Sequence, residues 1–353
     1  MRVFCYFIEP ADYTLDLVRN IHDQMNIDYA FLYSFSIAES SSTTSKLFLD
    51  KLSWLERIKY IIKKFFDNDL IIVNGYNNLP FLLSFILNLF FVRKRFIAIE
   101  SDTQLSIPNF FLKRLFKYLY LSFIFKNPNT LGFAGGNYSH KDLFSHYGMH
   151  KERIFLMPMM VDNNKFYYIK RDFSRPFNFL YVGRILRHKN IEVLINQFIK
   201  NFSDKSASLR IVGDGKQLSY LKNKYQANNI KFVGSLFGKE LINEFHLASC
   251  LVLPSLFEPW GLVVNEALSS GLPAVVSEKV GANFDLIDGR NTGLIACNDS
   301  QIGKSMLRLY SDKILLKSYS INAHKLMSEY WNYDLYSKCL RSVLANLNKT
   351  TNI

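Results

Sequence analysis

Cysteine is scarce in this chain of 353 residues: the four residues Cys5, Cys250, Cys297 and Cys339 are far apart. None of them belongs to a Cys-x-x-Cys pair or to a cysteine–histidine cluster with the spacing of metal ligands. This argues against a zinc ribbon and against a small scaffold held together by disulfides. We expect reduced cysteines, as in a cytosolic protein.

Long apolar runs are also missing. The N-terminal stretch 1–10 is too short for a signal peptide and has no small-residue cleavage site. The run from Leu79 to Val92 has only about 14 residues before three basic residues, whereas a membrane-spanning helix needs about 20. We therefore predict a cytoplasmic protein in which this run forms a buried helix; a segment that dips shallowly into a membrane is the alternative.

Acidic residues are absent from Thr103 to Lys141, and the formal net charge of the chain is +13. Such a field attracts phosphates, whether of nucleic acid, nucleotide or anionic lipid. No known nucleic-acid-binding motif is present, so a non-catalytic polyanion-binding protein remains only as an alternative from another functional class.

The residues that are abundant indicate a two-domain α/β protein. Apolar residues make up 49% of the chain, and its length exceeds what one hydrophobic core usually supports. Short apolar runs alternate with helical patterns, which predicts parallel sheets with crossover helices. The predicted strands are 3–8, 29–35, 70–74, 95–100, 130–134 and 154–157 in the first half, and 177–183, 208–213, 230–234, 250–254, 273–277 and 293–296 in the second.

The domain boundary is predicted where one βα series gives way to the next. We place the first domain at 1–162 and the second at 163–328, with a cleft between them where phosphorylated ligands bind. An amphipathic tail at 329–353 forms either an ordinary terminal helix or one that returns to the first domain.

The richest chemistry lies in one strand–turn–helix segment of the second half. Glu258 precedes a turn, and Glu266 lies on the helix that begins near Gly261. The backbone N–H groups of Gly261, Leu262 and Val263 at the helix start suit anionic oxygens. Carboxylate, anion site and carboxylate together describe a strip that binds sugar, diphosphate and ribose, although spacing alone also fits a loop acid and a solvated helix face.

This segment resembles a known family. Glu258 and Glu266 within Pro-Ser-x-x-x-Glu-Pro-Trp-Gly look like the Glu-x7-Glu signature of retaining glycosyltransferases of family 4, which have the GT-B fold of two Rossmann-like domains facing a cleft. Further segments agree in order and spacing, namely Tyr-Val-Gly-Arg-Ile-Leu-Arg-His-Lys-Asn at 181–190, Ile-Val-Gly-Asp-Gly at 211–215 and Pro-Met-Met-Val-Asp at 158–162.

The resemblance implies a role for each matching residue. Arg184 and Lys189, after the turn at Gly183, would hold the departing diphosphate; Glu258 would bind hydroxyls of the transferred sugar, and Glu266 the ribose. Fixed cations next to a leaving diphosphate stabilise its growing charge. We therefore expect no metal and no cofactor, with a nucleotide-diphosphate sugar as donor substrate.

The first domain departs from the family pattern. Many members carry a histidine after a middle strand, where this chain has Ile-Glu-Ser-Asp at 99–102. We assign the acceptor side to Asp102, with Glu100 as the second candidate. A helix N-cap after the strand is an equally good interpretation of Ser101 and Asp102.

Function follows from the resemblance: a retaining transfer of a sugar to a lipid-linked or polysaccharide acceptor, as in bacterial O-antigen, capsule or lipopolysaccharide assembly. The aromatic helix at 110–126 carries Lys113, Arg114 and Lys117 and suits the inner face of the cytoplasmic membrane, unless it is a core helix with a cationic edge. A sugar-nucleotide epimerase or a glucan-type synthase is the alternative. A dehydrogenase is disfavoured because no Gly-x-Gly-x-x-Gly follows the first strand.

Overall fold

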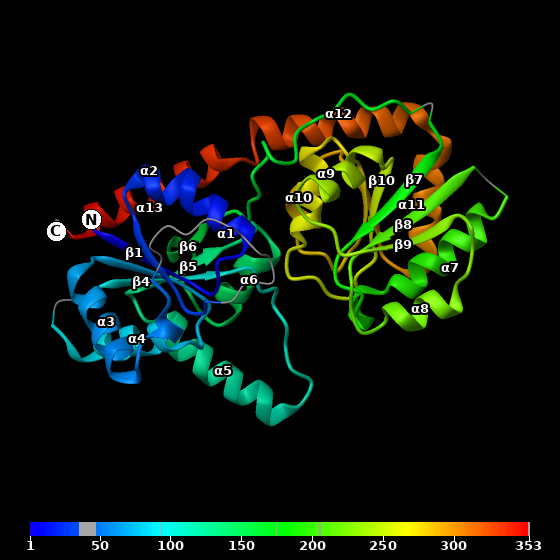
Figure 1. The fold of residues 1–353 in the computed structure, drawn as a ribbon. Helices are drawn as coiled ribbons and strands as arrows, with labels where there is room; N and C mark the ends of the chain where they lie inside the picture. The colour runs from blue at the N-terminus through cyan, green and yellow to red at the C-terminus, as the bar shows by residue number, and fades with distance from the viewer. Residues whose placement is uncertain (35–46, 93, 174, 205, 352–353) are drawn as a thin grey trace. The chain divides into compact units, whose positions relative to one another are not determined.

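The computed structural model describes residues 1–34, 47–92, 94–173, 175–204 and 206–351. It divides into two units: the first comprises Met1–Met160 with Tyr333–Ile353, and the second Val161–Asn332. Each unit contains one parallel six-stranded sheet (Figure 1).

The first unit is built around the strand order β2-β1-β3-β4-β5-β6. The four inner strands are short runs whose side chains are largely buried, as expected where helices cover both faces of a sheet, whereas the edge strands β2 and β6 are more exposed. Its elements are β1 (Val3–Phe7), α1 (Asp12–Leu17), η1 (Val18–His22), α2 (Asp23–Met25), β2 (Asp28–Phe31), η2 (Leu49–Lys51), α3 (Trp54–Asp67), β3 (Leu70–Asn74), α4 (Leu79–Phe90), β4 (Phe96–Ser101), α5 (Phe111–Lys126), β5 (Thr130–Ala134), α6 (Ser139–His146), η3 (Lys151–Arg153), β6 (Ile154–Leu156) and α13 (Tyr333–Thr351).

Local sequence signals set the helix starts in this unit. Ser53 caps α3 through a capping box with Glu56, and Asn78 Oδ1 accepts a hydrogen bond from the Phe81 backbone N–H at 3.1 Å at the start of α4. Figure 1 shows α3, α4 and α5 on one side of the sheet and α1, α2 and α13 on the other. The C-terminal helix α13 packs on η1 and β6.

The second unit has the strand order β12-β11-β10-β7-β8-β9. This is the strand order of a doubly wound sheet. The chain starts at β7, adds β8 and β9 on one side, and then returns to add β10, β11 and β12 on the other side, so the direction reverses between β7 and β10. Its elements are β7 (Phe177–Val182), η4 (Arg187–Lys189), α7 (Ile191–Phe202), β8 (Ala207–Val212), α8 (Leu218–Lys224), β9 (Ile230–Gly234), α9 (Gly238–Leu247), β10 (Cys250–Leu253), α10 (Leu262–Ser269), β11 (Ala274–Ser277), η5 (Asn283–Ile287), β12 (Gly293–Ala296), α11 (Asp299–Ser311) and α12 (Lys313–Glu329).

The α/β fold class with two parallel sheets is confirmed, and each predicted strand region contains a strand; residue 35, the end of the second predicted strand, lies outside the described residues. The tail differs from its prediction, because α12 runs to Glu329 and α13 begins only at Tyr333. The break is fixed by Trp331, which is fully buried and stacks on Trp260 with ring centroids 5.6 Å apart. Residues 352 and 353 of the predicted tail lie outside the described residues.

The prediction of a buried helix at 79–92 is only half right. Phe81 and Phe85 of α4 are buried, but Phe90 is 80% exposed and Val92, just beyond the helix, is 98% exposed. Among the residues described, no helix is long and apolar enough to cross a membrane.

Candidate functional site

The donor-site residues predicted from the sequence gather at the carboxyl edge of the second sheet. β7 and β10 lie next to each other there, and the loops that follow them are joined by a hydrogen bond of 2.8 Å from the Leu256 N–H to the His188 carbonyl. This is the reversal point of the strand order, where open α/β sheets bind ligands. Gly183, Arg184 and Lys189 follow β7, and Glu258 follows β10.

Lys189 and Glu258 form an ion pair at this edge. The Lys189 Nζ donates a hydrogen bond to Glu258 Oε2, and both side chains are largely buried. Ser255, fully buried, places its Oγ 3.4 Å from the same oxygen. A buried ammonium or carboxylate needs such a partner, so the two side chains hold each other in place at the end of the sheet.

The turn at Gly183 brings Arg184 to the same edge. Tyr181 Oη donates a hydrogen bond of 3.0 Å to the Arg184 carbonyl, while the Arg184 side chain is exposed. Burial, with a further contribution from the Glu258 carboxylate, raises the pKa of Tyr181. A Cβ on Gly213 would lie 2.0 Å from the Gly183 carbonyl oxygen, so the loops after β7 and β8 touch backbone to backbone.

Helix α10 begins directly beside the ion pair. Gly261 adopts φ +94°, and a Cβ there would approach Glu258 Cγ to 3.1 Å. Leu262 and Val263 form the first turn of α10, where backbone N–H groups lack partners within the helix. Glu266 lies on the same helix, one turn further on, and is partly buried.

The Trp-Gly part of this motif has a structural role. Trp260 is buried, donates from Nε1 to Asn265 Oδ1 at 2.7 Å, and stacks on Trp331. These contacts fix the turn between Glu258 and α10.

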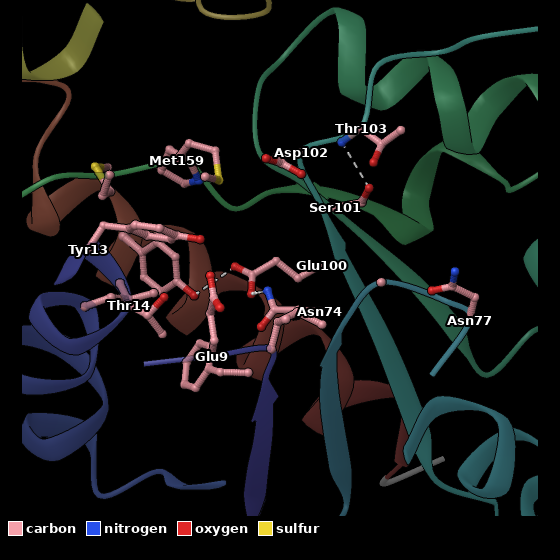
Figure 2. A pocket seen from close by; sticks show the side chains of 17 residues that line it. Glu9, Tyr13, Thr14, Asn74, Asn77, Glu100, Ser101, Asp102, Thr103 and Met159 are labelled. Carbon is pink, nitrogen blue, oxygen red and sulfur yellow. Dashed lines mark hydrogen bonds between the residues drawn. The ribbon is translucent and has the colours of Figure 1, made fainter. Parts of the chain in front are cut away.

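The first unit contains a separate cavity of about 260 Å³ at the carboxyl edge of its sheet (Figure 2). Both acceptor-side candidates line it: Glu100 at the end of β4 and Asp102 in the loop that follows. The N-cap interpretation of Ser101 and Asp102 is wrong, because an irregular segment follows β4 and the next helix, α5, begins only at Phe111. The structure adds Glu9 after β1 and Asn74 at the end of β3.

Glu100 is held inside this cavity by two donors. Asn74 Nδ2 donates to Glu100 Oε2 at 2.8 Å, and Tyr336 Oη from α13 lies 3.4 Å from Oε1. Burial raises the pKa of Glu100 to about 7, Asp102 adds to the rise, and the two hydrogen bonds oppose it. Glu100 therefore carries a proton for a substantial fraction of the time near neutral pH.

Sequence reasoning missed Glu9, Tyr13, Asn74 and Tyr336 in this cavity. A signal existed for Glu9 and Asn74, because polar residues directly after buried parallel strands gather at one edge. No short-range signal existed for Tyr336, which reaches Glu100 across 236 residues of sequence.

The predicted basic helix is α5. Lys113 and Arg114 are exposed, whereas Lys117 is partly buried and donates to the Ser106 carbonyl at 2.7 Å. The outer stripe of α5 is strongly apolar: Phe116 is 73% exposed and Phe123 is 62% exposed. Phe123 also contacts Phe85 of α4, with ring centroids 5.6 Å apart.

Part of the second unit is similar to a known family. Residues 169–326 match the family described as Glycosyl transferases group 1. Arg184, Lys189, Glu258 and Glu266 lie within the matched residues.

Curated relatives match part of the chain. An uncharacterized glycosyltransferase of Methanocaldococcus jannaschii is 32% identical over 165 residues, which is 45% of this chain and 42% of the relative. The UDP-Gal:alpha-D-GlcNAc-diphosphoundecaprenol alpha-1,3-galactosyltransferase of Escherichia coli is 33% identical over 146 residues, 39% of this chain and 38% of the relative. The matches thus span less than half the length of these relatives.

Solved structures share the fold of the whole chain. Anabaena HepE in complex with UDP-glucose is similar with a TM-score of 0.74 at 16% identity, over 98% of this chain and 100% of that one. The fold is therefore GT-B.

Proposed function

We propose that the protein is a retaining glycosyltransferase of family 4 that moves a sugar from a nucleotide-diphosphate donor to a lipid-linked or polysaccharide acceptor. The observation that carries the proposal is the Lys189–Glu258 pair beside the start of α10, at the strand-order reversal within the residues that match Glycosyl transferases group 1. The HepE structure with UDP-glucose supports a nucleotide sugar as the donor.

The charges at this edge suit a leaving diphosphate. Arg184, Lys189 and the first N–H groups of α10 provide positive charge where the phosphates would lie, and Glu266 would bind the ribose. Glu258 orients Lys189 and would bind hydroxyls of the transferred sugar. These groups supply the electrostatic stabilisation themselves, so the proposed transfer needs no metal and no cofactor.

The reaction we propose is a front-face displacement. The acceptor oxygen forms a bond to the anomeric carbon while the bond from that carbon to the diphosphate oxygen breaks. The leaving diphosphate oxygen takes the hydroxyl proton, and the products are the glycoside and a nucleoside diphosphate. The first unit would hold the acceptor in the cavity with Glu100 and Asp102.

We further propose that α4 and α5 attach the protein to the inner face of an anionic membrane, where a lipid-linked acceptor resides. The support is a pair of exposed apolar stripes on two contacting helices, flanked by exposed cations. The stripes consist of Leu82, Ile86, Leu89 and Phe90 on α4 and Leu112, Leu115, Phe116, Leu119 and Phe123 on α5. Such faces insert into the headgroup region, and each nearby Lys or Arg adds about 1 kcal/mol of attraction.

The donor site is tested with charge-removing, shape-conserving variants. We expect Arg184→Gln, Lys189→Met, Glu258→Gln and Glu266→Gln each to lower transfer from labelled UDP-sugars at least about tenfold, the usual effect of losing one transition-state contact. Arg187→Gln is the matched control, because Arg187 is exposed on the turn η4 beside Lys189. Wild-type rates in all four variants, with the fold intact by circular dichroism, would refute the assignment.

The same incubation separates the alternatives. One sugar added to a lipid or saccharide carrier supports the proposal, a free epimer indicates an epimerase, and a growing polymer indicates a glucan-type synthase. Absence of any turnover, together with tight binding of polyanions, would favour the non-catalytic alternative.

Membrane attachment is tested by flotation with vesicles that contain phosphatidylglycerol. Lys113→Glu/Arg114→Glu, which reverses two exposed cations of α5, should reduce flotation strongly, and Phe116→Ser/Phe123→Ser should reduce it even at high salt. Lys222→Glu/Lys231→Glu is the control, since it makes the same charge change on exposed residues of the second unit. Equal flotation of all variants would remove the membrane from the proposal.

A further inference from the structure

The cavity of the first unit has an unusual charge for so basic a protein. Its lining includes three carboxyl groups, from Glu9, Glu100 and Asp102, and no Lys, Arg or His among the residues that the structure describes. The chain as a whole carries a net charge of +13. The acidic lining of this cavity is therefore opposite in sign to the net charge of the chain.

The carboxylates converge on one space. In Figure 2 the Glu9 and Glu100 side chains lie close together, Asp102 lies further along on the loop after β4, and the Tyr13 ring lies at one side; all four line the same cavity. Burial raises the pKa of Tyr13, and Asp102, Glu9 and Glu100 each add to the rise, as expected when all three carboxylates lie near its hydroxyl. The three acids thus act on the same small volume.

The cavity offers many hydrogen-bond acceptors for its size. Besides the carboxylates, Asn74 lines it, and the Asn74 Oδ1 is buried without a hydrogen-bond donor among the described residues. A ligand that satisfies such a site must bring donors, either hydroxyl or ammonium groups. A carboxylate or phosphate group brings only acceptors and negative charge, and it would be repelled.

The remaining wall suits the carbon face of a sugar ring. Phe7, Leu17 and Met159 supply apolar surface, and Tyr13 supplies an aromatic ring. A volume of about 260 Å³ lies just below the range of about 300–1,000 Å³ typical of drug-sized ligands, which leaves room for a single ring.

We propose that this cavity binds the terminal sugar of the acceptor and accepts only a sugar ring without negative charge. A ring that carries a free amine should bind more tightly than one whose substituents are all neutral. This inference rests on the proposed function and narrows its acceptor class: an acceptor that ends in a uronic acid or a phosphorylated sugar is excluded.

The methionine side chains give a local readout in the intact chain. Met159 and Met160 line the cavity, while Met306 and Met327 lie in the second unit. With ¹³C-methyl methionine, NMR titrations use three probes that share one ring: a methyl glycoside, its 2-amino-2-deoxy form and its 6-carboxylate. The titrations are carried out with probes of both the gluco and the galacto configuration. Single Met→Leu variants show which NMR signal belongs to which methionine.

We expect the Met159 and Met160 signals to shift with the amine and neutral probes, with the carboxylate probe binding at least about tenfold more weakly. Glu9→Gln/Asp102→Asn should bring carboxylate and neutral probes to similar affinity, because shape is retained and only charge is removed. Glu152→Gln, at an exposed site of the same unit, should leave the order unchanged.

Equal affinity of the carboxylate and neutral probes in the wild type would overturn the inference, and so would the absence of any shift at Met159 and Met160 with the neutral and amine probes. The inference would also be overturned if Glu9→Gln/Asp102→Asn still bound the carboxylate probe much more weakly than the neutral probe. Parallel titrations with UDP, GDP and ADP, followed by calorimetry, report on the second unit alone. Absence of sugar binding in a chain that binds UDP rejects the acceptor inference, whereas absence of binding of UDP, GDP and ADP alike rejects the proposed donor.

Discussion

The pH dependence of stability provides a direct test of the cavity in the first unit. Glu100 has its pKa raised to about 7 from an ordinary value of 4.5, mainly because burial disfavours its charged form. Between these two pH values the folded chain holds a proton that the unfolded chain releases. The unfolding free energy must therefore fall as the pH rises through this window and become independent of this group above about pH 7.

The size of the effect follows from the shift. A change of about 2.5 pKa units corresponds to about 3 kcal/mol between acidic and alkaline conditions, at about 1.4 kcal/mol per unit. Glu100→Gln keeps the shape and mimics the protonated form, so its stability should approach that of the wild type as the pH falls to about 4.5. At pH 8 it should exceed the wild type by up to about 3 kcal/mol, which is several degrees in melting temperature.

The assay is the difference in melting temperature between Glu100→Gln and the wild type from pH 4.5 to pH 8.5. Glu152→Gln, which changes a side chain that is 87% exposed, is the control and should show no such trend. A difference that stays constant with pH, or a Gln variant that gains its advantage on the acidic side, would refute the environment described for Glu100.

Two further predictions concern the second unit. Arg171 donates to the Gly271, Ser270 and Ala248 carbonyls at 2.7 to 2.9 Å, past the ends of α9 and α10, so Arg171→Met should cost about 3–5 kcal/mol in thermal unfolding. Arg171→Lys should recover only part of that loss, because an ammonium lacks the guanidinium fork; full recovery would contradict the reasoning. For the ion pair, Lys189→Met and Glu258→Gln should each lower the melting temperature, and the double variant by less than their sum, since neither charge is then left buried alone. Strict additivity in a double-mutant cycle would mean that the pair is not coupled.

The sequence by itself determined the elements and their order. Short apolar runs such as 70–74 and 130–134 specify buried parallel strands, because burial on both faces leaves no polar alternation. The local arrangement of Glu258, Gly261 and Glu266 was also predictable, since they lie within one strand–turn–helix stretch whose geometry depends on neighbouring residues.

Only the tertiary structure decided which distant residues meet. The Lys189–Glu258 pair depends on β7 and β10 being neighbours in the sheet. The sequence around either residue does not specify this strand order. The contact of Tyr336 with Glu100 likewise requires the chain to return to the first unit after Asn332. The exposure of Phe116 and Phe123 could not be predicted from the sequence either. Apolar periodicity shows that one face of a helix is apolar, but not whether other elements cover that face. Local patterning follows from short-range sterics and burial, whereas the sites depend on the packing of segments that lie far apart in the chain.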